Sequence, residues 1–94
     1  MGEHKIKGEI IMTRTIFYKG KLYNGIFVSE FEFYYDIYID RQARLAILID
    51  DFGVVKSIQK LETYQIDVLL DDEDDEFLEE LEKLEDKFEK EMYK

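Results

Sequence analysis

The sequence contains no cysteine, no proline and no tryptophan. Without cysteine the chain can form no disulfide bond and no thiolate metal site, and it has no thiol nucleophile. Without proline, long helices and strands can run uninterrupted. No apolar run approaches the roughly 18 residues of a membrane-spanning helix. Residues 1–8 mix charges and lack the apolar region of a signal peptide. These absences favour a cytoplasmic protein that does not bind membranes.

Residues that could carry out catalysis are also few. The only histidine, His4, lies in an N-terminal stretch that we expect to be mobile, whereas a general base must be held in place. The only two serines, Ser29 and Ser57, lack the glycine-flanked context of a nucleophile elbow. No glycine-rich phosphate loop is present. We therefore expect no enzymatic activity and no cofactor.

Metal binding has only weak support in the sequence. Four acids fall at positions 1, 3, 5 and 12 of a calcium-loop register. These acids are Asp71, Glu73, Asp75 and Glu82. The glycine that such a loop needs at position 6 is replaced by Glu76. We expect diffuse attraction of divalent cations and no specific metal site.

The formal net charge of −10 is distributed very unevenly along the chain. Residues 71–94 hold thirteen acids and four lysines, whereas residues 1–70 hold ten acids and nine basic residues. An anionic chain is repelled by nucleic acids and by anionic lipid surfaces. The charge therefore predicts a partner with a basic protein surface and no direct binding to nucleic acid. An acidic tail that only keeps the protein soluble is the alternative explanation.

Most of the chain before residue 71 has the composition of β-strands. Residues 10–18 are rich in β-branched and aromatic side chains, and the Lys-Gly pair at 19–20 predicts a turn after them. Polar and apolar residues alternate through 27–39, which predicts one thirteen-residue strand with a strong bend or bulge. The Asn-Gly pair at 24–25 is a candidate turn or bulge.

The alternation in residues 27–39 places different side chains on the two faces of that strand. The odd-numbered positions are mainly apolar, so we expect them to face the core. The even-numbered positions combine aromatic rings with carboxylates, which suits contacts with arginine and lysine side chains of a partner. The contact residues expected on this face are Glu30, Glu32, Tyr34, Asp36 and Tyr38. A solvated outer face whose tyrosines support strand pairing explains the same pattern.

Two further turns divide the second half of this β-rich region. Residues 40–43 are typical of a hairpin loop, and an almost continuously apolar strand at 44–50 follows, which we expect inside the sheet. Residues 50–53 predict a second turn, in which Gly53 can adopt a positive φ. Residues 54–70 fit a helix poorly, so we favour a strand with a break near Lys60 and keep a helix as the alternative.

Residues 71–94 are predicted to form one acidic helix. Its apolar side chains recur at spacings of four, three and four, which gives a single stripe. The stripe consists of Phe77, Leu81, Leu84 and Phe88. We expect it to pack on the chain's own sheet. A short coiled-coil seam between two copies, which would make a homodimer, is the alternative to a monomer.

Charge pairing along this predicted helix is unfavourable. We compare five like-charge acid pairs that lie four residues apart with three opposite-charge pairs of the same spacing. At about 0.2–0.5 kcal/mol per pair, repulsion exceeds attraction by at most about 1 kcal/mol. The repulsive pairs are Asp72–Glu76, Asp75–Glu79, Glu76–Glu80, Glu82–Asp86 and Glu85–Glu89. A continuous helix would carry roughly one acid per 2.8 Å of its axis, within a factor of two of the phosphate density of duplex DNA.

Together these patterns predict an α+β fold. The expected architecture is a curved antiparallel β-meander of four to five strands, for which an SH3-like arrangement is one option, with one C-terminal acidic helix. The 94 residues form a single domain. We divide it into a flexible extension at 1–9, a β-sheet body at 10–70 and the acidic helix at 71–94.

The predicted function is protein binding. In size and charge alone the chain is similar to the small DNA-mimicking inhibitors that phages and mobile elements use against defence nucleases. We therefore expect an inhibitor in the host cytoplasm that occupies the basic nucleic-acid groove of such a protein. The acids expected to supply its field are Asp71, Asp72, Glu73, Asp74, Asp75, Glu76, Glu79, Glu80, Glu82, Glu85 and Asp86. The alternative is an accessory subunit of a larger complex, such as a transcription machine, docked through the apolar residues of the C-terminal helix.

Overall fold

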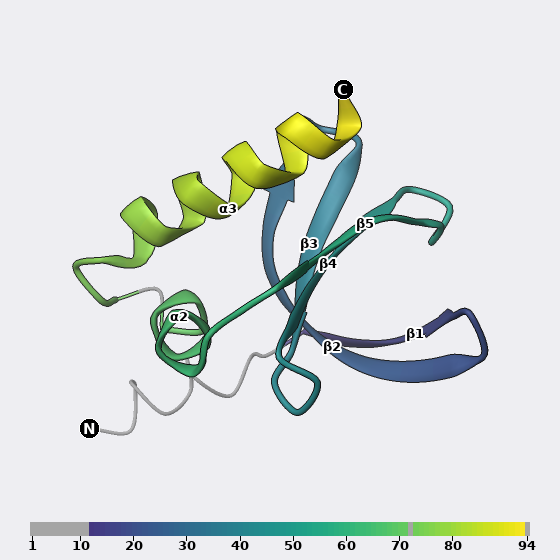
Figure 1. The fold of residues 1–94 in the computed structure, drawn as a ribbon, viewed down its shortest axis with the longest axis horizontal. Coiled ribbons are helices and arrows are strands. Elements are labelled where there is room, and N and C mark those ends of the chain that lie inside the picture. Colours follow the sequence, from purple (N-terminus) through teal and green to yellow (C-terminus); the bar gives the residue numbers. More distant parts are fainter. Residues whose placement is uncertain (1–11, 72, 94) are drawn as a thin grey trace.

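Five strands and two helices make up the described part of the chain, residues 12–71 and 73–93 of this computed structural model (Figure 1). In chain order they are β1 (Thr13–Tyr18), β2 (Lys21–Phe31), β3 (Tyr35–Asp40), β4 (Leu45–Asp50), β5 (Val55–Lys60), α2 (Thr63–Leu69) and α3 (Phe77–Met92). The extension predicted at 1–9 and the first two residues of the strand predicted at 10–18 lie outside the described residues.

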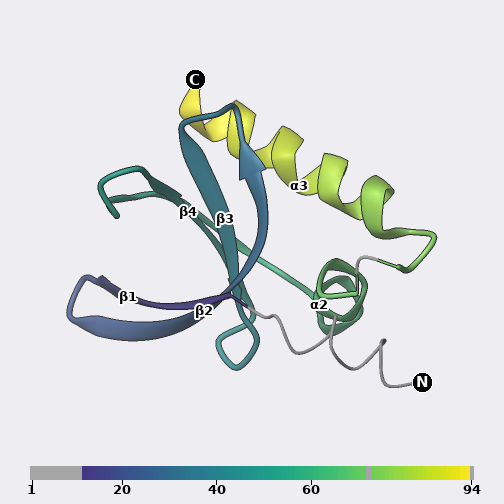
Figure 2. The ribbon, with the colours of Figure 1, turned by 180° about the vertical axis from the view of Figure 1, so that it is seen from behind.

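The sheet is an antiparallel meander in which each strand pairs with the next along the chain. Its order, β1-β2-β3-β4-β5, leaves β1 and β5 as open edges. Strong curvature is visible in β2, which bends so that β1 and the first half of β2 extend away from α3 (Figures 1 and 2). The predicted α+β class and the curved meander are therefore confirmed.

The alternating segment 27–39 forms a hairpin, so the prediction of one long strand is wrong. β2 ends at Phe31, which pairs with Tyr35 at the start of β3. Glu32 and Phe33 make the reversal with φ values of 54° and 66°, in the left-handed region. Glycine and asparagine usually occupy such positions. Neither is present here, so the turn carries no signal in the sequence.

The Asn-Gly pair at 24–25 lies inside β2, so it is neither a turn nor a bulge. Gly25 pairs with Arg14 of β1, and the register shift in β2 falls instead between Phe27 and Ser29. A Cβ added to Gly25 would lie only 2.9 Å from the Cβ of Tyr38. Glycine is needed at this position because another strand packs directly against its backbone.

The main hydrophobic core lies between one face of the sheet and the two helices. Phe88 of α3 and Ile37 and Leu48 of the sheet are at its centre and are fully buried. Ile66 and Leu69 of α2 complete it near the end of β5. The apolar stripe of α3 therefore faces the sheet of its own chain, as expected, and this contact closes the fold.

A second, smaller core lies on the opposite face of the sheet, where the β1–β2 hairpin curves over β3 and β4. It is built around Ile16, Tyr38, Ile47 and Ile49. β4 is consequently buried on both faces, which explains its almost continuous apolar sequence. Tyr38 also packs edge-on against Phe27, with ring centroids 5.7 Å apart.

The region 54–70 contains a strand followed by a helix. β5 covers residues 55–60 as predicted, but the prediction of strand beyond Lys60 is wrong because α2 begins at Thr63. Glu62 donates its backbone N–H to Oε1 of Gln65 at 2.8 Å, which is one half of a capping box. The Glu-x-x-Gln spacing at 62–65 was the available signal for this helix.

The acidic segment also divides differently from the prediction. α3 begins at Phe77, and residues 71–76 form a loop between the two helices. Asp74 accepts the backbone N–H of Glu76 at 2.8 Å, and Asp71 accepts that of Glu73 at 3.2 Å. Aspartate side chains compete in this way with helical hydrogen bonding, so an aspartate-rich run favours turns.

The three predicted turns at 19–20, 40–43 and 50–53 are confirmed. Lys19 and Gly20 both adopt positive φ in a two-residue reversal between β1 and β2. In the last turn, Asp50 accepts the backbone N–H groups of Val54 and Phe52 at 2.9 Å each. The hydrogen bond from Val54 is the main reason that the pKa of the Asp50 carboxyl is lowered.

Candidate functional site

The acids of the C-terminal quarter occupy two structural elements. The loop at 71–76 has a net charge of −6, and every one of its described residues is exposed. The helix α3 has seven acids and three lysines, a net charge of −4. The highest charge density therefore lies in the loop, at the N-terminal end of α3, where it also complements the helix dipole.

Four acids of α3 lie along one line on the surface that faces away from the sheet. They follow spacings of three, four and three residues, roughly opposite the buried apolar stripe. This acidic ridge consists of Glu79, Glu82, Asp86 and Glu89, all of them exposed. The ridge continues the loop, and we call the loop and the ridge together the acidic flank.

Lysines form a second line beside the acidic ridge. Lys83, Lys87 and Lys90 are exposed and lie on the adjacent side of α3. Two of them make ion pairs within the helix, Lys83 with Glu80 at 3.6 Å and Lys90 with Asp86 at 3.5 Å. The outer surface of α3 is therefore amphoteric, and only its acidic side adds to the field of the loop.

The predicted excess of like-charge repulsion is wrong for this helix. Three of the five repulsive pairs involve residues of the loop, so only Glu82–Asp86 and Glu85–Glu89 lie wholly within α3. Lys83–Lys87 is a third repulsive pair within the helix, so three repulsive pairs are balanced by three attractive pairs. Glu85 still has a raised pKa, mainly because it is partly buried and secondarily because Glu82 is near.

Glu80 does not contribute to the exposed field, although we predicted that it would. Its side chain is buried, with 5% relative exposure. Its carboxylate accepts hydrogen bonds from the Tyr64 hydroxyl at 3.3 Å and from Nε2 of Gln65 at 3.4 Å. Glu80 thus joins α3 to α2. Asp72, which belongs to the same predicted set, lies outside the described residues.

The apolar stripe of α3 is not available to a second copy of the chain. Leu81, Leu84 and Phe88 are 8%, 3% and 0% exposed, and Phe77 packs partly buried against the same core. A coiled-coil seam through these residues would first have to remove α3 from the sheet. The homodimer predicted as an alternative is therefore incompatible with this packing.

The other predicted contact residues gather around the turn between β2 and β3. Glu32 and Tyr34 lie in the turn, and Glu30 and Asp36 face each other across the two strands beside it. Phe33, which we expected in the core, is 92% exposed at the end of the hairpin, next to Tyr34 at 66%. We call residues 32–34 the hairpin tip.

The C-terminal end of α3 is attached to the hairpin tip. The Tyr93 hydroxyl donates a hydrogen bond to Oε1 of Glu32 at 2.7 Å. This hydrogen bond is the main reason that the pKa of Tyr93 is raised. Figure 1 shows the C-terminus beside the β2–β3 turn, at the opposite end of α3 from the acidic loop. The acidic loop and the hairpin tip region therefore lie at opposite ends of α3, and the other predicted acids lie along the helix between them.

Tyr38 is not a surface residue, so its predicted role in partner contact is wrong. It is 6% exposed and belongs to the second core. The prediction failed because the β1–β2 hairpin covers the face that we expected to be solvated. Asp40, on the same face, is buried as well and accepts the backbone N–H groups of Asn24 at 3.0 Å and Ala43 at 2.9 Å.

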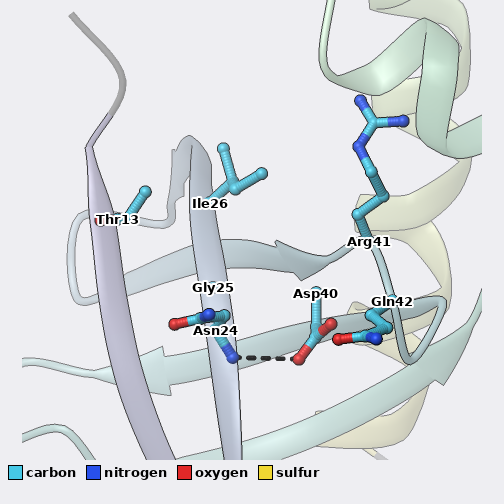
Figure 3. Close-up of a pocket in the computed structure, with 7 residues that line it drawn as sticks. All are labelled: Thr13, Asn24, Gly25, Ile26, Asp40, Arg41 and Gln42. Atoms are coloured by element: carbon cyan, nitrogen blue, oxygen red, sulfur yellow. Dashed lines mark hydrogen bonds between the residues drawn. The ribbon is translucent and has the colours of Figure 1, made fainter.

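Asp40 also lines a pocket of about 490 Å³ between β1, β2 and the β3–β4 loop (Figure 3). The Asp40 carboxylate points toward Asn24, and Arg41 extends away from the pocket toward α2, where it pairs with Asp67 at 3.3 Å. Both carboxylate oxygens of Asp40 already accept backbone hydrogen bonds. We therefore assign Asp40 a structural role in the β3–β4 loop.

Sequence reasoning missed Phe33 as a surface residue of the hairpin tip and Tyr93 as a residue that contacts the tip. No residue near Phe33 has a strong preference for turns. Tyr93 and Glu32 are 61 residues apart in the sequence, so no local pattern predicts their contact. Among the described residues, no helix is long and apolar enough to cross a membrane.

Comparison with protein-family models, with curated protein sequences and with solved structures finds no match to this chain. Its function must be argued from its own residues.

Proposed function

We propose that this chain is a non-enzymatic binding protein whose acidic flank docks on the basic, nucleic-acid-binding surface of another protein and blocks it. The proposed setting is the cytoplasm of a host cell, where the chain acts as a DNA mimic of phage or mobile-element origin. The partner is a defence nuclease or another protein that binds DNA or RNA.

The observation that carries this proposal is the dense run of acids at the start of the acidic flank. No lysine or arginine occurs in residues 71–82, a segment that contains nine acids. The described acids of the loop are exposed, and the backbone N–H of Asp74 donates to the carbonyl oxygen of Asp71 at 3.0 Å within it. Acids that serve solubility alone would work equally well in a disordered tail or interspersed with lysines. An anionic surface held in a defined shape suits a cationic partner.

The spacing of the acids also supports mimicry of a single nucleic-acid strand. Six acids of α3 other than Glu80 lie along the 16 residues of the helix. At 1.5 Å per residue this gives one carboxylate per about 4 Å. Phosphates follow one another at about 3.4 Å of axis along each strand of B-DNA. The match is to one strand, since the helix is less densely charged than a duplex.

The alternative of an accessory subunit anchored by α3 receives no support from the packing. The side chains that would anchor it, Leu81, Leu84 and Phe88, are buried in the chain's own core. Docking through them would require partial unfolding.

Affinity capture with duplex-DNA competition tests the proposal. The tagged chain is incubated with lysate of a host bacterium at low salt, and captured proteins are then eluted with increasing concentrations of duplex DNA. We expect nucleic-acid-binding proteins to be captured and then released by the DNA, because the acidic flank and the DNA compete for one surface. Capture that DNA does not reverse would contradict the proposal, as would recovery of no such protein.

Charge-reversal variants provide the control. Asp75→Lys with Glu79→Lys alters the acidic flank, whereas Asp51→Lys with Asp67→Lys makes the same change in net charge elsewhere. All four positions are exposed. The proposal expects the first pair to abolish capture and the second to retain it. Equal losses would indicate that only net charge matters.

A further inference from the structure

Beyond Lys21 at the start of β2, the β2–β3 hairpin contains acids and aromatic rings but no lysine or arginine. No lysine or arginine occurs in residues 22–40, which include four acids. At the end of the hairpin, Phe33 and Tyr34 are 92% and 66% exposed. Large aromatic side chains are usually buried, so two adjacent exposed rings indicate a surface that can contact a partner.

The hairpin also keeps features that weaken it. Glu30 and Asp36 are directly paired across the strands, where like charges repel each other. Glu32 and Phe33 hold left-handed backbone conformations that glycine would adopt without strain. Neither feature contributes to the packing of the core, which begins at Phe31 and Tyr35. Binding of a cation at this end would offset the repulsion between Glu30 and Asp36.

The structure also orients one carboxylate of the hairpin tip. The Tyr93 hydroxyl binds Oε1 of Glu32 at 2.7 Å, which orients the Glu32 side chain at the tip. Oε2 has no such restraint from Tyr93 and can accept from an incoming donor. The hairpin tip therefore combines one oriented carboxylate with two exposed aromatic side chains that directly follow it in the sequence.

We propose that the hairpin tip is an arginine-binding point, at which a guanidinium group of the protein partner stacks on Phe33 or Tyr34 and pairs with Glu32. This inference rests on the proposed function, because it names the side chain of the basic partner that the tip recognises. A planar guanidinium can stack on a ring and bond a carboxylate at the same time. A lysine ammonium is a compact, strongly hydrated charge and gains less from the rings.

A titration with two short peptides, end-blocked tri-arginine and end-blocked tri-lysine, tests the inference. Ring signals of Phe33 and Tyr34 are followed by NMR in the intact chain, and Phe52 is the reference because it is 88% exposed in another turn. We expect the tri-arginine peptide to shift the tip rings several-fold more than the Phe52 ring, and several-fold more than tri-lysine does. Equal shifts with the two peptides, or equal shifts at Phe52, overturn the inference.

Two glycine variants separate recognition from folding. Phe33→Gly removes an exposed ring and relieves the left-handed backbone, so its unfolding temperature should not fall. Phe52→Gly removes an equally exposed ring elsewhere. We expect Phe33→Gly to lose most of the Tyr34 response to tri-arginine, and Phe52→Gly to keep it. A full response in Phe33→Gly contradicts the role of the ring.

The outcomes also distinguish this inference from the proposed function. The charge reversal of Asp75 and Glu79 should leave the ring shifts at the tip intact, because the acidic loop lies at the other end of α3. If capture depends on the flank but the tip rings do not respond to tri-arginine, only the arginine-binding point is wrong. If the rings respond to tri-arginine but the charge reversal of Asp75 and Glu79 does not reduce capture, the proposed function is wrong.

Discussion

Single residues decide how closely the two halves of the sheet can approach. Gly25 lies where the β1–β2 hairpin curves over β3, and an added Cβ would be 2.9 Å from Tyr38 Cβ and 3.0 Å from Ile16 Cδ1. Both contacts involve buried atoms of the second core, so neither neighbour can move away freely.

We predict that Gly25→Ala lowers the free energy of unfolding by about 1–3 kcal/mol through overpacking. Urea unfolding followed by circular dichroism measures the change. Asn24→Ala is the matched control on the same strand, because its exposed side chain leaves the backbone bond to Asp40 intact. The control should change stability by less than about 0.5 kcal/mol. Equal effects of the two substitutions would contradict the packing argument.

A second prediction at this scale concerns Tyr93. Its pKa is raised above 10.0, chiefly because the neutral phenol donates a hydrogen bond to Glu32. A folded-state pKa above the unfolded value means that the contact stabilises the fold fully below about pH 10 and is lost as pH rises through the folded-state pKa. NMR titration of the Tyr93 ring measures this value.

Glu32→Gln should lower the pKa of Tyr93 towards 10.0, because it removes the charged acceptor and its repulsion of the phenolate. Glu30→Gln is the matched control, since Glu30 lies in the same hairpin but is not among the groups that raise this pKa. An unchanged Tyr93 pKa in Glu32→Gln would show that the hydrogen bond is not formed in solution.

Individual side chains were the hardest features to predict from the sequence. Tyr38 and Asp36 occupy equivalent places in the alternation, yet Tyr38 is buried and Asp36 is not. The difference arises because the β1–β2 hairpin covers only one end of β3. This long-range packing leaves no trace in a local pattern.

The ends of strands and helices were predictable from the sequence wherever a residue that favours a turn or a cap marks them. Gly20 and Gly53 supply the positive φ of two turns, and Asp50 caps the second one with its side chain. The turn at 32–34 has no such residue, so two strands were interpreted as one. The helix boundary at Phe77 was missed for the opposite reason, because acidic residues are common both in helices and in the turns that precede them.

At the scale of elements, α3 is predicted to be held by its apolar stripe. Phe88→Ala should lower the free energy of unfolding by about 3–5 kcal/mol, because it leaves a cavity in the main core. Leu78→Ala is the control on the same helix, with a side chain 68% exposed, and should be nearly neutral. Urea unfolding of both variants measures the difference, and equal stability of both would contradict the packing of α3.

At the scale of the whole molecule, the fold separates stability from charge. The sheet, α2 and the inner side of α3 form the two cores, whereas the acids of the flank lie on the loop before α3 and along the outer side of α3. The charge asymmetry could be predicted from the composition of the chain. The division of the acids between a loop and a helix could not. Mixed aromatic and acidic residues occupy the opposite end, at the hairpin tip.

This arrangement predicts how binding responds to salt. If the acidic flank replaces nucleic-acid phosphates, partner affinity should fall steeply as salt increases, since both sides release bound counterions. Charge reversal of Asp75 and Glu79 should flatten this dependence. The Asp51 and Asp67 variant, with the same net charge, should largely retain it.

The most direct test of the central claim is the dissociation constant of the captured nucleic-acid-binding protein for these three chains at low and high salt. We predict that the Asp75 and Glu79 reversal weakens binding at least about tenfold at low salt and that the Asp51 and Asp67 reversal changes it far less. Equal affinity of the unaltered chain and the flank variant, with the same salt dependence, would contradict the claim that the acidic flank is the docking surface.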